Sequence, residues 1–245
     1  MKTNPLIGLL LLAGFLFTQA VNAQNYDYLR PLYRAAMNNA VYPDSSKIDW
    51  NLVAINSKNP DLIWKSFDGE PHVLMLAWIS KKSLSYYPPK GQDTLYKTSS
   101  HLIWVTAAPQ LKKWFHKQNP PDTNLRIKQL LGLPPVNEYS YFVEFWVKPA
   151  DLIRPCPDSL INDNSCSTCF PDNVSKDYVT WFNQTRIDRY YQCDLYYQYP
   201  WTQLGYTYDW NPGNPTHRGM SEFVIKANSW VRIKHISTTK QYLTK

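Results

Sequence analysis

The sequence has little glycine, and after its first residues it has no long apolar run. Only 8 of the 245 residues are glycine, whereas 19 are proline, so we expect loops that proline stiffens. No apolar run beyond residue 23 approaches the roughly 18 residues that a membrane-spanning helix needs. Internal repeats and low-complexity linkers are also absent, and this favours one globular domain.

Known catalytic and metal-binding motifs are absent as well. The chain contains no G-x-S-x-G elbow, no H-E-x-x-H and no glycine-rich phosphate loop. Its histidines lack metal-ligand spacing, so we predict no metal and no cofactor. The net charge is +7, but lysine and arginine are scattered, at most in pairs such as Lys81-Lys82. This scatter argues against nucleic acid as a partner.

The first residues have the three parts of a secretory signal peptide. Lys2 supplies a positive start, residues 6–17 are uniformly apolar, and small side chains at 21–23 suit a cleavage site. We therefore expect residues 1–23 to be a signal peptide. Residues 24–245 would then form a single globular domain of a secreted or periplasmic protein without a transmembrane segment.

Hydrophobic periodicity predicts a mixture of helices and strands. Asp68-Gly69 is a hairpin signal, Thr106 and Asp122 are expected helix N-caps, and Asn228-Ser229 is expected to join a C-terminal hairpin. Helices are expected at 25–39, 108–117, 123–131 and 173–184, and strands at 61–68, 72–80, 100–106, 139–148 and on both sides of 228–229. This order predicts an α+β fold, with a mostly antiparallel sheet and several short helices.

Four cysteines raise the choice between zinc, redox chemistry and disulfides. Cys156, Cys166 and Cys169 lie in the stretch RPCPDSLINDNSCSTCFPD, and Cys193 follows later. Zinc sites usually use two C-x-x-C pairs, and a redox C-x-x-C begins a helix; this chain offers one such pair, after a long polar loop. Export favours disulfides. The expected bridges are Cys156–Cys166, which staples the loop, and Cys169–Cys193, although sequence leaves other pairings open.

Residues 190–210 carry nine aromatic side chains, more than one strand face needs to bury. Core packing explains many of them, but tyrosine and tryptophan also suit a surface that stacks on a ligand. Nearby Pro200, Gly205 and Pro212 predict loops. We therefore expect four of the aromatic side chains to be exposed for binding: Trp201, Tyr206, Tyr208 and Trp210.

A set of polar residues follows directly. Asp209, His217, Arg218 and Glu222 place two acids, an imidazole and a guanidinium before a predicted strand. Together they are candidates for general acid–base chemistry, with Arg218 stabilising an anionic intermediate. A solvated surface is the alternative for this group.

Two resemblances accompany these residues. The segments LGLPPVNEYSYFVEFWVKPADLIRPCPD and YPWTQLGYTYDW…GMSEFVI resemble an uncharacterised family of bacterial secreted or hypothetical proteins, which implies no activity. The strand SEFVI is similar to the strand of ADP-ribosyltransferases that carries a catalytic glutamate, and Glu222 alone matches that pattern.

Two functions stay open on sequence alone. A binding module for a small molecule, a glycan, an envelope component or a protein is favoured, because aromatic density is high and catalytic motifs are missing. A hydrolase or transferase, ADP-ribosyltransferase-like in the second resemblance, is the alternative. It requires His217, Arg218 and Glu222 to converge in one cavity.

Overall fold

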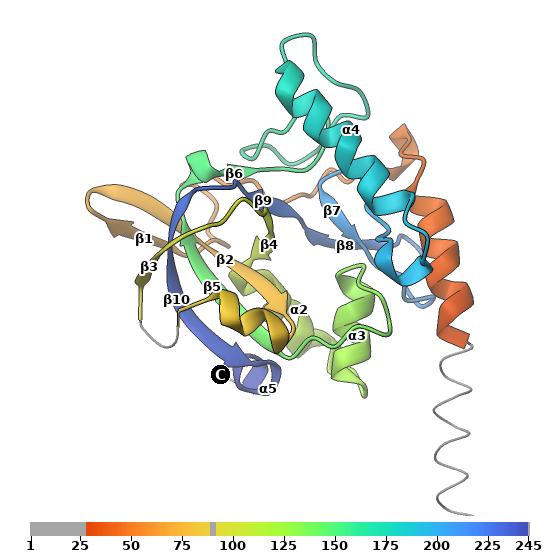
Figure 1. Cartoon of the computed structure of the whole chain (residues 1–245), viewed down its shortest axis with the longest axis horizontal. Helices are drawn as coiled ribbons and strands as arrows, with labels where there is room; N and C mark the ends of the chain where they lie inside the picture. Colours follow the sequence, from red (N-terminus) through yellow and green to blue (C-terminus); the bar gives the residue numbers. More distant parts are fainter. Residues whose placement is uncertain (1–27, 89–91, 245) are drawn as a thin grey trace, which may run out of the picture.

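Strand β2 (Glu70–Ile79) lies at the centre of the fold. The structure is a computed structural model that describes residues 28–88 and 92–244. These residues form an α+β single domain, as predicted, whose large sheet has the order β3-β10-β5-β2-β4-β9-β6, with β1 paired to β2 (Figure 1). Its other strands are β1 (Trp64–Phe67), β3 (Thr94–Lys97), β4 (Ile103–Ala107), β5 (Tyr141–Val147), β6 (Leu152–Ile153), β9 (Phe223–Ile225) and β10 (Trp230–Thr238). Strands β7 (Tyr206–Tyr208) and β8 (Arg218–Ser221) form a second, two-stranded sheet.

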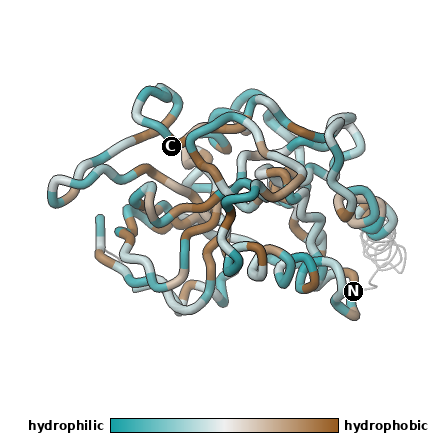
Figure 2. Tube along the Cα trace, turned by 90° about the horizontal axis from the view of Figure 1, so that it is seen from above, coloured by the Kyte–Doolittle hydropathy of each residue, from teal (hydrophilic) through white to brown (hydrophobic). Residues whose placement is uncertain are grey.

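The large sheet is buried on both faces. All its strand pairings in the described ranges are antiparallel. Alternate residues of β2 enter two separate apolar clusters, because side chains of a strand point to opposite faces. Val73, Met75 and Ala77 belong to one cluster, and Leu74, Leu76 and Trp78 belong to the other. Figure 2 shows apolar segments gathered in the middle of the molecule, with more polar loops around them.

Helices cover the sheet and flank the small one. The described helices are residues 28–40, α2 (Ala108–Gln118), α3 (Thr123–Leu130), α4 (Lys176–Tyr190) and α5 (Thr239–Thr244), with short 3₁₀ turns at Ser45–Lys47, Lys82–Tyr86, Pro149–Asp151 and Leu195–Tyr197. Figure 1 shows α4 and the helix at 28–40 on the same side of the molecule as β7 and β8, away from β1 and β3. None of the helices in the described ranges combines the length and the apolar character of a membrane span.

Local sequence signals explain several boundaries. Asp68 and Gly69 have φ of 53° and 81°, the positive values that a tight hairpin turn between β1 and β2 requires. The carboxylate of Asp122 accepts a hydrogen bond from the Leu125 N–H at 2.9 Å, so its predicted role as the N-cap of α3 is confirmed. The predicted signal peptide and the first residues of the predicted helix at 25–39 lie outside the described residues.

Two helix starts differ from the prediction. Thr106 does not cap α2: it pairs with Leu76 inside the sheet, and β4 continues to Ala107, which precedes α2 without a side-chain cap. Helix α4 begins at Lys176 rather than at 173, because the Ser175 hydroxyl accepts a hydrogen bond from the Tyr178 N–H at 3.2 Å.

The predicted C-terminal hairpin is wrong. Strand β9 pairs with β4 and β6, whereas β10 pairs with β3 and β5. The turn between β9 and β10 is held by another segment instead. The Thr98 hydroxyl donates to the Lys226 carbonyl at 3.0 Å and accepts from the Ser229 N–H at 2.8 Å. With the turn bound in this way, β10 lies between β3 and β5 instead of beside β9.

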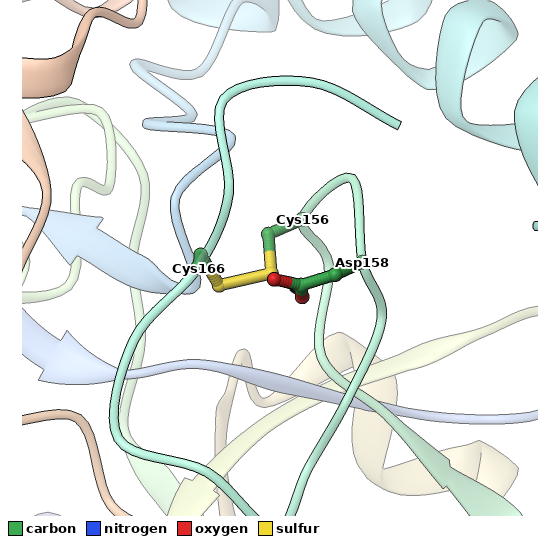
Figure 3. A group of neighbouring side chains, drawn as sticks. All are labelled: Cys156, Asp158 and Cys166. Carbon is green, nitrogen blue, oxygen red and sulfur yellow. Dashed lines mark hydrogen bonds between the residues drawn. A yellow bond between two sulfur atoms is a disulfide. The ribbon is translucent and has the colours of Figure 1, made fainter. Parts of the chain in front are cut away.

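The cysteine loop contains one disulfide. Cys156 and Cys166 are bonded, as predicted, and both are buried beside Leu52, Leu204 and Tyr206. Figure 3 shows the Asp158 carboxylate against this bridge, with Oδ1 3.1 Å from Cys156 Sγ. A disulfide sulfur has no proton to donate, so this contact is not a hydrogen bond.

The predicted bridge between Cys169 and Cys193 is wrong, because both are free and exposed. Helix α4 lies between them in the chain. Its 15 residues make it about 22 Å long, and one cysteine precedes its start while the other follows its end. A disulfide needs Cα atoms within about 7 Å, so a helix of this length between the two cysteines works against the predicted bridge.

Candidate functional site

Glu222 occupies the point where the chain leaves the small sheet and enters the large one. It lies between β8 and β9, and its N–H donates to the Gly205 carbonyl at 2.9 Å. The neighbouring Ser221 hydroxyl accepts from the Val53 N–H at 2.8 Å, and Phe223 enters the apolar core. Because side chains alternate along an extended chain, the Glu222 side chain emerges on the other face.

Gly205 makes this junction possible. Its φ is +75°, and a Cβ atom at this position would lie 2.7 Å from both Arg154 Cδ and Cys166 Sγ. Arg154 is fully buried, and its guanidinium donates to the carbonyls of Leu160 and Asp163 at 2.7 and 2.8 Å. The disulfide loop therefore supports the backbone that positions Glu222.

The Glu222 side chain lines a cavity of about 240 Å³ that is partly open to solvent. Strands β2, β4, β5 and β7 contribute to its wall, together with α2, α4 and the segments that follow α3 and α4. Most of the wall is apolar or aromatic, a composition typical of small-molecule sites. The apolar part includes Leu76, Trp78, Leu111, Leu131, Leu133 and Phe142.

Helix α4 brings a cation to the cavity. Phe182, Thr185 and Arg189 are three and four residues apart, so they share one face of the helix. Phe182 and Thr185 are buried, and the Phe182 ring lies 4.7 Å from the Trp201 ring. Arg189, at the end of this face, lines the cavity.

Two aromatic rings hold the Arg189 guanidinium. Its central carbon lies 4.8 Å from the ring centroid of Trp104 and 4.8 Å from that of Tyr199. Such contacts stabilise a guanidinium and leave its N–H groups, which lie in its plane, available to donate. Within the ranges that the structure describes, the guanidinium has no ion pair and no hydrogen bond.

Two buried polar atoms in the cavity wall have no partner among the described residues. They are the indole Nε1 of Trp201 and the Oε2 of Glu222. A buried polar atom without a partner costs free energy, and such atoms are uncommon in native proteins. One unpaired donor and one unpaired carboxyl oxygen in the same wall are what a polar ligand group would satisfy.

Burial changes the acidity of Glu222. Loss of hydration raises its pKa to about 8, and the positive charge of Arg189 offsets only part of this rise. The residue keeps some accessible surface because it lines the cavity, although its carboxyl lies deep in the protein. At neutral pH the carboxyl is therefore mostly protonated and can donate a hydrogen bond.

The predicted exposure of four aromatic side chains is wrong. Trp201, Tyr206, Tyr208 and Trp210 are at most 5% exposed. Proline and glycine do lie in the irregular segments around them, but the rings are buried in the interior. Trp201 and Tyr208 nevertheless line the cavity, whereas Tyr206 and Trp210 do not.

The last two rings have structural contacts. The Tyr206 hydroxyl donates to the Lys47 carbonyl at 2.8 Å, and the Trp210 indole N–H donates to the Leu133 carbonyl at 3.1 Å.

The four predicted polar residues do not converge on one cavity. Only Glu222 lines the cavity described above. Asp209 is fully buried and forms a two-bond ion pair with Arg126, with N–O distances of 2.9 and 2.6 Å. His217 stacks on Tyr208, and its Nδ1 lies 2.9 Å from the Asp209 carbonyl oxygen. Arg218 donates to the Ile48 carbonyl at 2.8 Å.

Three further wall residues were not singled out as site residues in the sequence analysis. Trp104, Arg189 and Tyr199 come from β4, from α4 and from the segment after α4. The one sequence signal was the face of α4, where a basic residue continues a row of buried positions. Nothing local links that face to β4, because only the folded chain brings them together.

A metal site has little support. Among the described residues, one group of potential ligands is close enough for a metal ion, namely Cys156, Asp158 and Cys166. Its sulfur atoms are joined in the disulfide (Figure 3), so neither is a thiolate ligand.

The chain matches no protein-family model, no curated protein and no solved structure with which it was compared. The functional interpretation therefore depends on the geometry of the cavity.

Proposed function

We propose that this protein is an exported binding module that holds a small ligand in the cavity around Glu222. The single observation that carries this proposal is the pair of unpaired polar atoms, Trp201 Nε1 and Glu222 Oε2, in an aromatic wall. Packing alone gives no reason to leave both atoms without a partner. A ligand with an apolar body and one polar group would cover the rings and complete the hydrogen bonds.

The size of the cavity supports a small ligand. Its volume of about 240 Å³ is slightly below the range of roughly 300–1,000 Å³ for drug-sized ligands. A long glycan or a protein surface would reach the cavity only with one side chain or one ring. The Cys156–Cys166 disulfide supports export, because such bonds persist in oxidising compartments.

We do not extend the proposal to a hydrolase or transferase. That alternative needs His217 and Arg218 beside Glu222, and neither lines the cavity. A protonated glutamate without a second reactive group near it is better suited to binding than to acid–base catalysis.

Calorimetric titration with a panel of small aromatic and aliphatic compounds, uncharged and charged, tests this proposal. We expect at least one compound to bind saturably to the wild type and to raise its Tm. Trp104→Ala, which removes part of the wall, should abolish binding. Trp50→Ala should not, because Trp50 is 68% exposed and lies outside the cavity.

A second variant covers the case in which Trp104→Ala fails to fold. Leu131→Phe adds volume to the wall instead of removing it, and it should block the same compounds. The proposal is wrong if no compound binds the wild type saturably, or if a folded variant with an altered wall binds as the wild type does.

A further inference from the structure

Three side chains of the cavity wall can donate hydrogen bonds to a ligand. Trp201 Nε1 is a donor only, the Arg189 guanidinium carries five N–H groups and no acceptor, and the protonated Glu222 carboxyl has an O–H. All three residues line the same cavity. A ligand group that accepts several hydrogen bonds and carries negative charge would match this set.

We infer that the cavity binds a small carboxylic acid, with its carboxylate against Arg189 and Trp201 and its apolar body against Trp78 and Phe142. This inference rests on the proposed function and specifies the class of its ligand. The reasons follow from the positions of the cation, the acid and the rings.

Arg189 supplies the charge that selects a carboxylate. The planar guanidinium matches the two oxygens of a carboxylate, and such paired hydrogen bonds are among the strongest in proteins. Contacts with Trp104 and Tyr199 hold the group in place before a ligand arrives. Less side-chain freedom is then lost on binding, so the cost in free energy is small.

Glu222 does not oppose this charge while it is protonated. The charged or titratable groups around it are Arg189 and Tyr190 of α4, Tyr139 and Tyr199 across the cavity, and Tyr208 of β7. Burial raises the pKa of Tyr139, Tyr190 and Tyr208, so these three phenols are neutral near pH 7. The side chains around Glu222 therefore carry one charge, the positive charge of Arg189.

The apolar side chains of the cavity wall fit an apolar body. Trp78 stacks on Phe142 with ring centroids 5.7 Å apart and on Tyr139 with centroids 5.1 Å apart. Leu76 and Leu111 extend this wall. An ammonium ligand would also find aromatic faces here, but the fixed charge of Arg189 repels it. The cation and the apolar faces of the wall together favour an amphipathic acid over an amine or a sugar.

Titration calorimetry with matched probes tests the inference. The probes are straight-chain and aromatic carboxylates of about five to ten carbon atoms, including benzoate, with the corresponding amides and amines. At pH 6.5 we expect the best carboxylate to bind the wild type at least tenfold more tightly than its amide. We expect its amine not to bind.

Two substitutions separate the contributions. Arg189→Met keeps an unbranched apolar side chain and removes the guanidinium, and it should weaken carboxylate binding at least tenfold while leaving amide binding nearly unchanged. Arg30→Met is the matched control, because Arg30 also lies over a tyrosine ring, that of Tyr196, but does not line the cavity. It should leave both affinities unchanged.

The pH profile gives an independent readout. For the wild type, carboxylate affinity should fall as the pH rises through 8, because Glu222 then becomes an anion beside the ligand. Glu222→Gln stays neutral, so its affinity should be constant between pH 6.5 and 9.5.

The outcomes distinguish the two levels of interpretation. If amides or amines bind the wild type as tightly as carboxylates, or if Arg189→Met has no effect, the carboxylate inference is wrong while the binding function stands. If no probe of any class binds saturably, the proposed function itself is wrong.

Discussion

Asp209 and Glu222 have buried carboxyl groups and lie close together in the sequence, but the protein surrounds the two groups in opposite ways. Both Asp209 oxygens accept hydrogen bonds from Arg126, and one also accepts from the Asn214 amide at 2.9 Å. Glu222 Oε2 has no partner in the described part of the chain, and the residue lines a cavity. Removal of one partner of a fully paired buried charge destabilises the fold, whereas an unpaired carboxyl beside a cavity is available to a ligand.

The same contrast extends to the surrounding aromatic residues. On the Asp209 side, Trp114 lies against Arg126, and Tyr33 packs edge-on against Trp210 with ring centroids 5.7 Å apart. On the Glu222 side, Trp104 and Tyr199 lie against Arg189, which has no carboxylate partner within the described residues. The two regions thus use the same residue types, and only one has its polar groups satisfied.

Loss of the Asp209 carboxylate should have the largest effect on stability. Asp209→Ala leaves the Arg126 guanidinium without its carboxylate partner, while the Asn214 amide keeps only its bond to the Arg218 carbonyl. We expect a loss of about 3–5 kcal/mol in the free energy of unfolding, measured by urea denaturation. Asp61→Ala is the control, because it breaks an exposed ion pair with Lys113 at 2.7 Å and should change little. Equal losses of unfolding free energy for the two substitutions would show that the buried, paired Asp209 matters no more than an exposed ion pair.

Glu222→Gln should raise the free energy of unfolding, unlike Asp209→Ala, and the size of this increase should depend on pH. The pKa of Glu222 is raised from 4.5 to about 8 in the folded protein. The folded protein therefore holds a proton that the unfolded chain releases between these two values, and wild-type stability falls as the pH rises through this window.

Glu222→Gln removes that loss. The unfolding free energy of the variant relative to that of the wild type should therefore increase by on the order of 1 kcal/mol per pH unit between pH 5 and 8. Urea denaturation at several pH values measures this difference. A constant difference across the window would show that the carboxyl is ionised in the folded state.

Removal of the disulfide tests whether the cysteine loop supports the Glu222 side. The bridge closes a short loop, because Cys156 and Cys166 are separated by 10 positions in the sequence. The double substitution Cys156→Ser, Cys166→Ser should cost about 2–3 kcal/mol of unfolding free energy. Because the loop packs against Gly205, the double substitution should also weaken ligand binding in the cavity. The matched pair Cys169→Ser, Cys193→Ser should change neither property, since both thiols are exposed.

The smallest expected effect separates two tyrosines of β7. Tyr206→Phe loses the hydrogen bond to the Lys47 carbonyl, which should cost about 1 kcal/mol. Tyr208→Phe should cost less, because no hydrogen bond from the Tyr208 hydroxyl is present within the described ranges. Thermal unfolding of the two variants measures this difference. A larger loss of stability for Tyr208→Phe would show that the Tyr208 hydroxyl, and not that of Tyr206, makes the stabilising hydrogen bond.

Sequence reasoning was most successful for the fold. Strand β2 is long and apolar on both faces, and β5 is rich in β-branched and aromatic residues, so both patterns are strong. The Asp68-Gly69 turn and the Asp122 cap depend on local chemistry, which sequence records directly. The C-terminal hairpin failed because Thr98, far away in the chain, binds the turn that was expected to close it.

The candidate site was predicted only in part. Glu222 was identified because it is an acid at the start of a predicted strand, and Trp201 because it lies in an aromatic segment. Arg189 was not identified, since its role depends on Trp104 and Tyr199, which only the folded chain places beside it. Exposure of Tyr206 and Trp210 was predicted from neighbouring turn residues, which determine the path of the backbone but not the direction of a ring.

The most direct measurement follows the glutamate carboxyl carbons by ¹³C NMR as the pH is raised from 3 to 10, in the wild type and in Glu222→Gln. We expect one wild-type carboxyl to titrate near pH 8 and to be missing from the variant. If every glutamate carboxyl of the wild type titrates near pH 4.5, Glu222 is hydrated or paired, and the cavity does not hold an unpaired acid.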